Sequence, residues 1–281
     1  MSNPEPRAPA GSRGVGRILC LLGALVVAVA GAGCAPRRLV LPSGPGAPRP
    51  DFETVFDEAT SGCRGVRTFS AELALSGRAA GRRIRRARVQ AGLVAPGAVY
   101  LLAPAPAGPP VLILAARTDR GALLLPRDRV AVRDAPVREL LDALAGLDLG
   151  TADLQALLTG CVVPDRRPQG GREYAGLVAI DLEAAEVAWV RRQGDRWRVV
   201  AGQRAGLAVE YSGYGTEPGA TPRALDVRSL PPASAAVDLH VRLSQVELNL
   251  PLDPETFSVV IPPGVESITV EELREWAPLA R

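Results

Sequence analysis

Few residues of this 281-residue chain have the types and spacing that chemistry requires. Its single histidine, His240, excludes every site that needs two, including histidine-rich zinc sites and two-histidine iron sites. No serine lies in a nucleophile-elbow pattern, and no glycine-rich phosphate loop follows a predicted strand. The carboxylates are scattered, without a spacing that pairs them as acid and base. The sequence therefore predicts neither an enzyme nor a cofactor, and four cysteines remain as its reactive side chains.

The first two cysteines lie in an export signal. Residues 1–17 are polar and carry three arginines, residues 18–33 are apolar and end in small residues, and Cys34 follows. This order is typical of a secretory signal peptide. Ala32 and Gly33 directly before Cys34 resemble a bacterial lipobox, which implies cleavage before Cys34 and lipidation of its thiol, with palmitate among the attached chains. Cys20 lies inside the apolar run and is then lost with the signal.

Two alternatives for this segment are an ordinary secretory peptide and a single membrane anchor. The lipobox is favoured because the apolar run has only sixteen residues, whereas a transmembrane helix needs about 20. The pattern departs from the lipobox at Gly31, where leucine or another aliphatic residue is usual. Ala35 follows the cysteine, where the enterobacterial sorting rule places aspartate for inner-membrane retention. The resemblance thus implies a lipid anchor at Cys34 on the periplasmic face of the outer membrane.

The rest of the chain has the composition of a globular domain. Hydrophobic residues make up 47% and charged residues 22% of the sequence. The net charge is +3, and the part after the signal is nearly neutral, which argues against a nucleic-acid partner. The arginine run 82–88 has no interleaved aromatic residue, so we interpret it as a solvated strand face. We divide the chain into a signal peptide (1–33), a lipidated tether rich in proline and glycine (34–50) and one domain (51–281).

Hydrophobic periodicity predicts an α+β domain with an antiparallel sheet. Apolar residues at helical spacing predict a helix over 51–62, and Thr269 with Glu272 predicts a capping box at a final helix. Gly77 to Gly81 is expected to turn the chain. His240 falls on the polar face of its strand, which favours a solvated or hydrogen-bonded histidine over a catalytic one. Alternation with a period of two predicts strands at 68–76, 86–93, 98–103, 110–117, 121–126, 129–133, 172–182, 186–192, 196–203, 206–213, 223–229 and 236–248.

Two amphipathic helices interrupt the strands over residues 136–161. Their leucines recur at helical spacing, and Gly146, Gly150 and Gly160 punctuate them. Whatever the function, this pattern predicts two helices that cover one face of the sheet. The leucines expected to face the sheet are Leu140, Leu141, Leu144, Leu147, Leu154, Leu157 and Leu158.

Cys63 and Cys161 are the cysteines of the domain itself. An exported protein enters an oxidising compartment, where an even pair of cysteines usually forms a bridge. A bridge would connect the N-terminal helix to the end of the two middle helices. Two buried free thiols are the alternative.

Several motifs over most of the domain resemble the LolA/LolB superfamily of lipoprotein carriers, and LolB more than LolA. The most specific is the helical segment of the form ELL-x-x-L-x-G followed by L-x-x-L-L-x-G, which spans Glu139 to Gly160. The others are Ser76-Gly77-Arg78, Pro106-Ala107-Gly108, Asn249-Leu250-Pro251, and Phe257 before Ile261-Pro262-Pro263-Gly264.

This resemblance implies a half-open antiparallel β-barrel with a helical lid inserted mid-chain. The expected function is an outer-membrane-anchored lipoprotein that binds acyl chains in an apolar cavity and accepts lipoproteins or lipids for membrane insertion. Its expected partners are membrane lipids or lipoprotein acyl chains and a periplasmic LolA-like donor, with the chain itself a monomer. Phe69, Leu73 and Val89 are expected to line the cavity together with the lid leucines.

The resemblance also implies a membrane-facing loop at Pro106, Ala107 and Gly108. In LolB this loop carries an exposed leucine that helps insert the lipid, and Ala107 takes that place here. The alternative function is a structural or regulatory lipoprotein that binds a protein partner without lipid transfer. A cavity large enough for acyl chains favours the carrier, whereas a cavity filled by side chains favours the alternative.

Overall fold

The computed structural model describes residues 38–162, 166–204, 206–217, 219–231, 236–276 and 279. The chain divides into two compact units, residues 1–41 and 42–281. The predicted signal peptide and Cys34 lie outside the described residues. Among the described residues, none of the helices has the length and hydrophobicity needed to cross a bilayer. The second unit holds the sheet, the core and the helices, so we expect residues 42–281 to fold as a domain by themselves.

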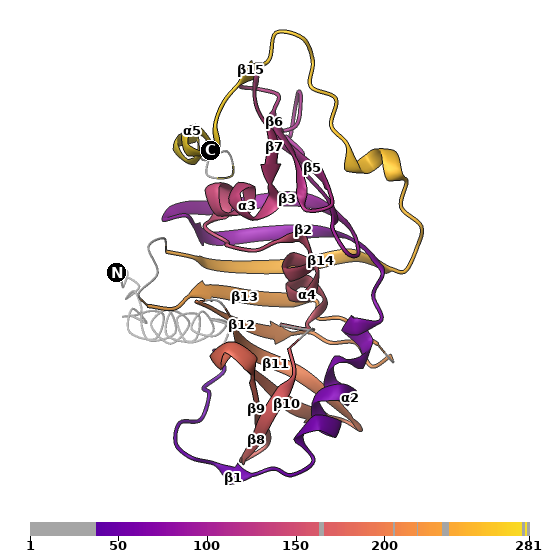
Figure 1. Ribbon diagram of the computed structural model, residues 1–281, viewed down its shortest axis with the longest axis vertical. Coiled ribbons are helices and arrows are strands. Elements are labelled where there is room, and N and C mark those ends of the chain that lie inside the picture. Colours follow the sequence, from indigo (N-terminus) through magenta and orange to yellow (C-terminus); the bar gives the residue numbers. More distant parts are fainter. Residues whose placement is uncertain are drawn as a thin grey trace, which may run out of the picture. The chain divides into compact units, whose positions relative to one another are not determined.

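The described part of this unit is built on one 15-stranded sheet, antiparallel except for its last pair (Figure 1). The sheet order is β1-β8-β9-β10-β11-β12-β13-β14-β2-β3-β4-β5-β6-β7-β15. The strands are β1 (Ala47–Pro48), β2 (Thr68–Ala79), β3 (Arg82–Val94), β4 (Ala98–Ala103), β5 (Leu112–Arg117), β6 (Arg120–Leu125), β7 (Val130–Pro136), β8 (Pro168–Tyr174), β9 (Leu177–Leu182), β10 (Val187–Gln193), β11 (Arg196–Arg204), β12 (Leu207–Ser212), β13 (Ala224–Ser229), β14 (Asp238–Leu248) and β15 (Glu266–Ser267).

Two meanders make up this sheet, one from β2 to β7 and one from β8 to β14. Pairing of β14 with β2 joins them, with Leu243 opposite Leu73 in the middle of the seam. The edge strands β1 and β15 do not pair with each other, so the barrel is half-open, as the sequence predicts.

Four α-helices and two short 3-10 turns complete the described elements. They are α2 (Phe52–Arg64), α3 (Val137–Ala145), α4 (Thr151–Thr159), α5 (Val270–Trp276), η1 (Glu183–Ala185) and η2 (Pro254–Phe257). The helices α3 and α4 follow β7 and precede β8, so the helical insertion lies between the two meanders. The predicted capping box of α5 is present, because the Thr269 amide donates to Glu272 Oε2 at 2.7 Å and the Glu272 amide donates to Thr269 Oγ1 at 3.2 Å.

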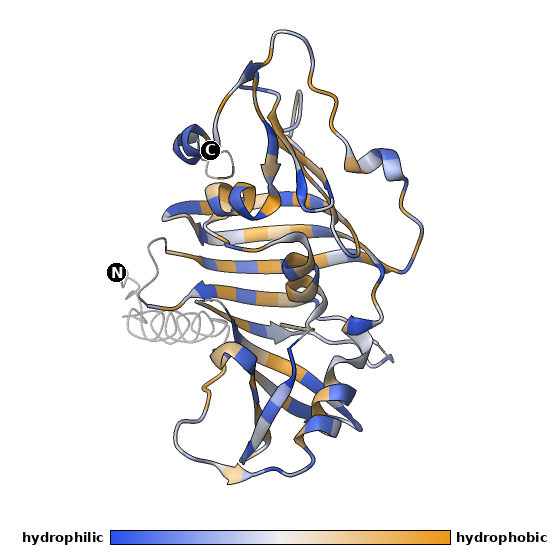
Figure 2. Ribbon diagram, in the orientation of Figure 1, coloured by the Kyte–Doolittle hydropathy of each residue, from blue (hydrophilic) through white to orange (hydrophobic). Residues whose placement is uncertain are grey.

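Alternation decides which side chains of each strand face the helices. In β2, Phe69, Ala71 and Leu73 are buried, whereas the side chains between them are partly exposed. Figure 2 shows the same alternation of hydrophobic and hydrophilic residues along the central strands. Each predicted strand overlaps at least one observed strand.

Two boundaries differ from the prediction. The chain does not turn at Gly77, because β2 continues to Ala79 and only Ala80 and Gly81 form the turn. Gly77 instead lies at a bulge with φ of +120°, where a Cβ atom would stand 2.1 Å from the Asp238 carbonyl oxygen. The segment 172–182 is two strands, because Gly176 adopts a φ of +77° and reverses the chain.

The folded unit also begins earlier than the predicted domain boundary at residue 51. β1 lies inside the segment interpreted as a tether and pairs with β8. Arg49 forms ion pairs with Asp51 at 2.5 Å and with Glu173 at 2.9 Å, which attaches the start of the domain to the sheet edge. Two-residue strands are too short to leave a periodic signal in a sequence.

Candidate functional site

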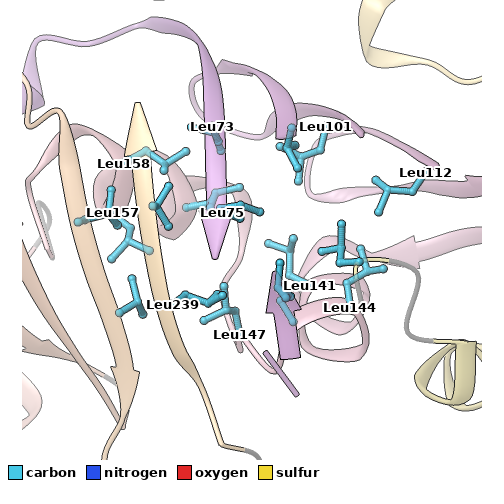
Figure 3. A pocket seen from close by; sticks show the side chains of 18 residues that line it. Leu73, Leu75, Leu101, Leu112, Leu141, Leu144, Leu147, Leu157, Leu158 and Leu239 are labelled. Carbon is cyan, nitrogen blue, oxygen red and sulfur yellow. The ribbon is translucent and has the colours of Figure 1, made fainter. Parts of the chain in front are cut away.

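A cavity of about 90 Å³ lies between the sheet and the helices α3 and α4. Figure 3 shows that the side chains around it are hydrocarbon only. Its lining residues are Leu73, Leu75, Ile84, Val89, Leu101, Leu112, Leu141, Leu144, Ala145, Leu147, Leu154, Leu157, Leu158, Leu225, Val227, Leu239, Val241 and Leu279. Because no polar side chain is among them, this cavity offers burial of apolar surface and no group for acid–base or nucleophilic chemistry.

Eight of the ten residues expected in the cavity and lid line it. They are Leu73, Val89, Leu141, Leu144, Leu147, Leu154, Leu157 and Leu158. Phe69 and Leu140 do not, although both are completely buried in the same core. Phe69 lies near the start of β2, away from the strand positions that border the cavity.

Sequence reasoning missed the part of the lining that the second meander contributes. Leu225 and Val227 on β13 lie opposite Val241 and Leu239 on β14. Alternation predicts which side chains of β14 face inward, but it does not predict which strand lies next to β14 in the sheet. Leu279, near the C-terminus, gave no periodic signal at all.

Polar contacts of described residues fix α4 at several points of its short length. Arg204 of β11 is buried, and its guanidinium donates to Asp153 and to the Val162 carbonyl at 2.7 Å. Asp153 Oδ2 also accepts from Arg138 at 3.0 Å and from the Gly150 amide at 3.1 Å. Burial raises the pKa of Asp153, but the hydrogen bond and charge of Arg204 outweigh it and hold that pKa below its usual value.

Neighbouring side chains add two further attachments to α4. At its start, the Thr151 amide and hydroxyl both donate to Asp119 Oδ1 at 2.9 Å. In its middle, Gln155 is buried and donates to the Val66 carbonyl at 2.8 Å. These bonds attach α4 to the β5–β6 turn and to the segment between α2 and β2.

A disulfide joins Cys63, near the end of α2, to Cys161, just past the end of α4. Their Cα atoms are 5.6 Å apart, and 98 positions separate them in the sequence. The alternative of two free thiols is therefore not what the structure shows. This link fixes the C-terminal end of α4 to a helix that packs on β8 and β11.

The helix α3 is attached by more exposed contacts. Its Arg138, with a side chain that is 46% exposed, pairs with Asp148 at 2.9 Å and with Asp153 of α4 at 3.0 Å. The apolar face of α3, which includes Leu140, Leu141 and Leu144, is buried, and the helix packs on α5 and β7. At its ends the Val137 amide donates to the Asp119 carbonyl at 2.9 Å, and its Ala145 carbonyl accepts from the Ala80 amide at 3.1 Å.

One exposed ion pair connects α3 to the C-terminal helix. Asp142 of α3 meets Arg274 of α5 at 2.9 Å, with side chains that are 39% and 46% exposed. Solvent screens a pair with this exposure, so it adds little to the attachment of α3.

A small groove lies at the edge of the cavity, beside the β2–β3 turn. Ile84, Leu144 and Leu279 line both the groove and the cavity, so these three side chains separate the apolar interior from the outside. The outer part of the groove is bordered by Ala80 of the turn and by the cationic side chains of Arg82 and Arg274. At this edge the cavity lies close to the outer surface.

Two other predicted features lie away from the cavity. The loop with Pro106, Ala107 and Gly108 is exposed between β4 and β5, and Arg127 donates to the Ala107 carbonyl at 2.7 Å. It presents no large apolar side chain. His240 is hydrogen-bonded, as expected, with its Nδ1 2.7 Å from Asp226 Oδ1 on the next strand.

No protein-family model matches the sequence, and no curated protein is similar to it. Solved structures are similar to it, and one of them superposes well enough to share its fold. A LolA superfamily protein from Nitrosomonas europaea is 14% identical and superposes with a TM-score of 0.51, over 77% of this chain and 99% of that one. A DUF1329 family protein from Desulfovibrio piger, also 14% identical, gives 0.48 over 74% of this chain and 97% of that one. The half-open sheet with its inserted helices is thus a LolA-like fold.

Proposed function

We propose that this chain is a non-enzymatic, outer-membrane-anchored lipoprotein that binds acyl chains beneath α3 and α4 and accepts lipoproteins or lipids for insertion. The observation that carries the proposal is the all-hydrocarbon cavity between the sheet and the two helices. Each methylene group that moves from water into such a cavity contributes about 0.8 kcal/mol. The motifs that resemble LolB and the lipobox at Cys34 support the location and the type of cargo.

The size of the cavity determines how a chain can enter. Its 90 Å³ is well below the range of roughly 300–1,000 Å³ that is typical of small-molecule sites. The structure therefore corresponds to a closed state, and uptake requires a helix to move. We assign that movement to α3, because it is held by its apolar face, by contacts at its ends and by ion pairs of half-exposed arginines, whereas α4 is fixed by a disulfide and by an ion pair with a buried arginine.

Movement of α3 would also widen the groove beside the β2–β3 turn, because Leu144 is one of the three residues between groove and cavity. Leu141 and Leu144 leave the sheet in this step, and the acyl chain replaces their contacts. No covalent bond changes, so transfer follows the difference in affinity between donor, cavity and bilayer.

The second candidate function is a structural or regulatory lipoprotein that binds a protein partner without moving lipid. The observation that favours it is the same small volume, since leucine side chains already fill most of the space. The exposed loop with Ala107 also lacks an apolar residue that would enter a membrane. The two candidates differ in one property, which is whether the domain takes up an acyl chain.

Native mass spectrometry of residues 42–281 with an added triacylated lipopeptide tests this property. A carrier shows a stoichiometric adduct that is lost in Leu141→Glu and Leu157→Glu, because a buried carboxylate opposes an apolar ligand. The matched control is Leu250→Glu, which changes a leucine that is 51% exposed. A protein without an adduct, and without lipid extracted from the expression host, would contradict the carrier and favour the protein-binding alternative.

A crosslink separates loss of uptake from loss of folding. The backbone hydrogen bond between Ala80 and Ala145 places these residues side by side. Ala80→Cys with Ala145→Cys should therefore form a disulfide that holds α3 closed. Uptake should stop in the oxidised double variant and continue in each single variant. Continued uptake by a fully crosslinked protein would show that α3 does not open.

A further inference from the structure

The start of β3 carries the densest cluster of positive charge in the described part of the molecule. This strand carries five arginines and no acidic residue, whereas the net charge of the whole chain is +3. Only the side chains of Ile84, Val89 and the apolar residues after them are buried in β3. We use the term arginine hairpin for Arg82, Arg83, Arg85 and Arg86, which are all exposed.

The arginine hairpin is not neutralised by its surroundings. None of its four arginines forms an ion pair or side-chain hydrogen bond with a described residue. Two carboxylates on the neighbouring elements β2 and α3 have other cationic partners: Glu72 pairs with Arg88 at 3.3 Å and Asp142 with Arg274 at 2.9 Å. Four guanidinium groups thus remain available for an external anion.

The location of this charge connects it to the cavity. Arg82 borders the groove that Ile84, Leu144 and Leu279 separate from the apolar interior. Figure 1 shows the β2–β3 end beside α3, and Figure 2 shows hydrophilic residues along the start of β3. A surface that binds Arg82 and its neighbours would therefore lie beside this edge of the cavity.

We propose that the arginine hairpin docks on the anionic phospholipid headgroups of a bilayer. Arginine suits this partner because its planar guanidinium binds phosphate oxygens in pairs, and clusters of basic residues are attracted to anionic leaflets. A protein partner is disfavoured because the described large hydrophobic residues that are exposed, Val40, Leu250 and Val260, all lie outside the hairpin. A nucleic acid is disfavoured because β3 has no aromatic residue on which bases could stack.

Docking is a separate step from uptake and goes beyond the proposed function. Docking requires the charges of β3, but it does not require that the cavity be occupied. The domain would still dock if it bound no acyl chain, and it would still bind lipopeptide in solution if it did not dock. Vesicle binding and lipopeptide uptake therefore report on the two proposals independently.

The test is flotation of residues 42–281 with vesicles of phosphatidylglycerol and phosphatidylcholine in equal parts, and with vesicles of phosphatidylcholine alone. Each arginine near an anionic surface contributes about fivefold to partitioning, and these factors multiply, so a variant with Arg82, Arg83, Arg85 and Arg86 all changed to Gln should bind up to about 600-fold more weakly. The matched control changes Arg129, Arg133, Arg167 and Arg192 to Gln, which removes the same charge from exposed sites elsewhere.

The expected result is binding to the anionic vesicles only, a large loss in the hairpin variant and a small loss in the control. Circular dichroism should show that both variants keep the fold, since all the changed side chains are exposed. An equal loss in the control would assign the effect to net charge and overturn the proposal. Equal binding to the neutral vesicles, or tighter binding to duplex DNA than to the anionic vesicles, would also overturn it.

Discussion

The two helices that cover the cavity are of the same length and contribute similar leucines, but they are attached in different ways. α4 has a disulfide at one end, a carboxylate paired with a buried arginine near the other, and a buried glutamine between them. α3 relies on its apolar face, on backbone bonds at its ends and on ion pairs of the half-exposed Arg138 and Arg274, one of which joins Arg138 to Asp153 of α4. Apolar contacts can be replaced by an acyl chain, whereas a disulfide and an ion pair cannot. The difference indicates a fixed wall, α4, and a movable flap, α3.

The largest expected effect comes from removing the disulfide. Cys63→Ser with Cys161→Ser opens a loop of 98 positions, which lowers the free energy of unfolding by about 4–5 kcal/mol in the chain-entropy model. Urea unfolding measures this loss. If the disulfide is what fixes α4, the amides of α4 should lose more hydrogen-exchange protection in this double variant than the amides of α3 do. Equal loss of protection in both helices would show that they move as one unit.

The second effect comes from the carboxylate at the start of α4. Asp153→Asn leaves the buried Arg204 without its anionic partner, so the free energy of unfolding should fall by about 2–3 kcal/mol. This expected loss is smaller than for a fully buried ion pair, because the Asp153 side chain is 26% exposed. Replacing Arg138 by Gln is the comparison, because that side chain is 46% exposed and contacts the same carboxylate. A similar loss in both variants would mean that Arg204 does not anchor the helix.

Acid should weaken the same anchor by a smaller amount. The pKa of Asp153 is lower in the folded state than its ordinary value of 3.8. Its contribution is therefore fully present above the unfolded-state pKa and is lost as the pH falls through the lowered folded-state pKa. Unfolding titrations between pH 6 and pH 2 should show a steeper fall for the original protein than for Asp153→Asn. Parallel curves would contradict the role given to this carboxylate.

The same contrast explains what could be predicted from the sequence. The leucines of both helices follow the helical period, and eight of ten expected residues line the cavity. The attachments carry no such period: Asp153 meets Arg204 across 51 positions, and Gln155 reaches Val66 across 89. Contacts of this kind depend on which strands become neighbours. The sequence left the disulfide open, because it does not show whether Cys63 and Cys161 lie close enough to form a bond.

The strand order limited the prediction of the site in a similar way. Alternation identifies the inward face of β14, but only the pairing of β14 with β13 and β2 shows that Leu225 and Leu73 border one cavity. Short elements were missed because two residues have no period, as in β1 and β15. Gly77 was interpreted as part of a turn because glycine is common both in turns and at bulges, and its φ is positive here.

The smallest effect on stability should be the most informative about the flap. Asp142→Asn removes the ion pair of α3 with Arg274, and because both side chains are well exposed the free energy of unfolding should change by less than about 0.5 kcal/mol. Uptake of lipopeptide should nevertheless become faster, since the closed position of α3 loses one of its attachments. Stopped-flow fluorescence with a labelled lipopeptide measures the rate.

Glu139→Gln is the control for Asp142→Asn, because it removes the same charge from an exposed position of α3 that forms no ion pair with a described residue. Its uptake rate should match that of the original protein. The opposite pattern, in which Asp142→Asn leaves the rate unchanged and Cys63→Ser with Cys161→Ser increases it, would assign the opening movement to α4, because the disulfide attaches α4 and includes no residue of α3. The strength of the attachments would then not predict which helix moves, and the ion pair between Arg138 and Asp153 would have to break or to carry the two helices together.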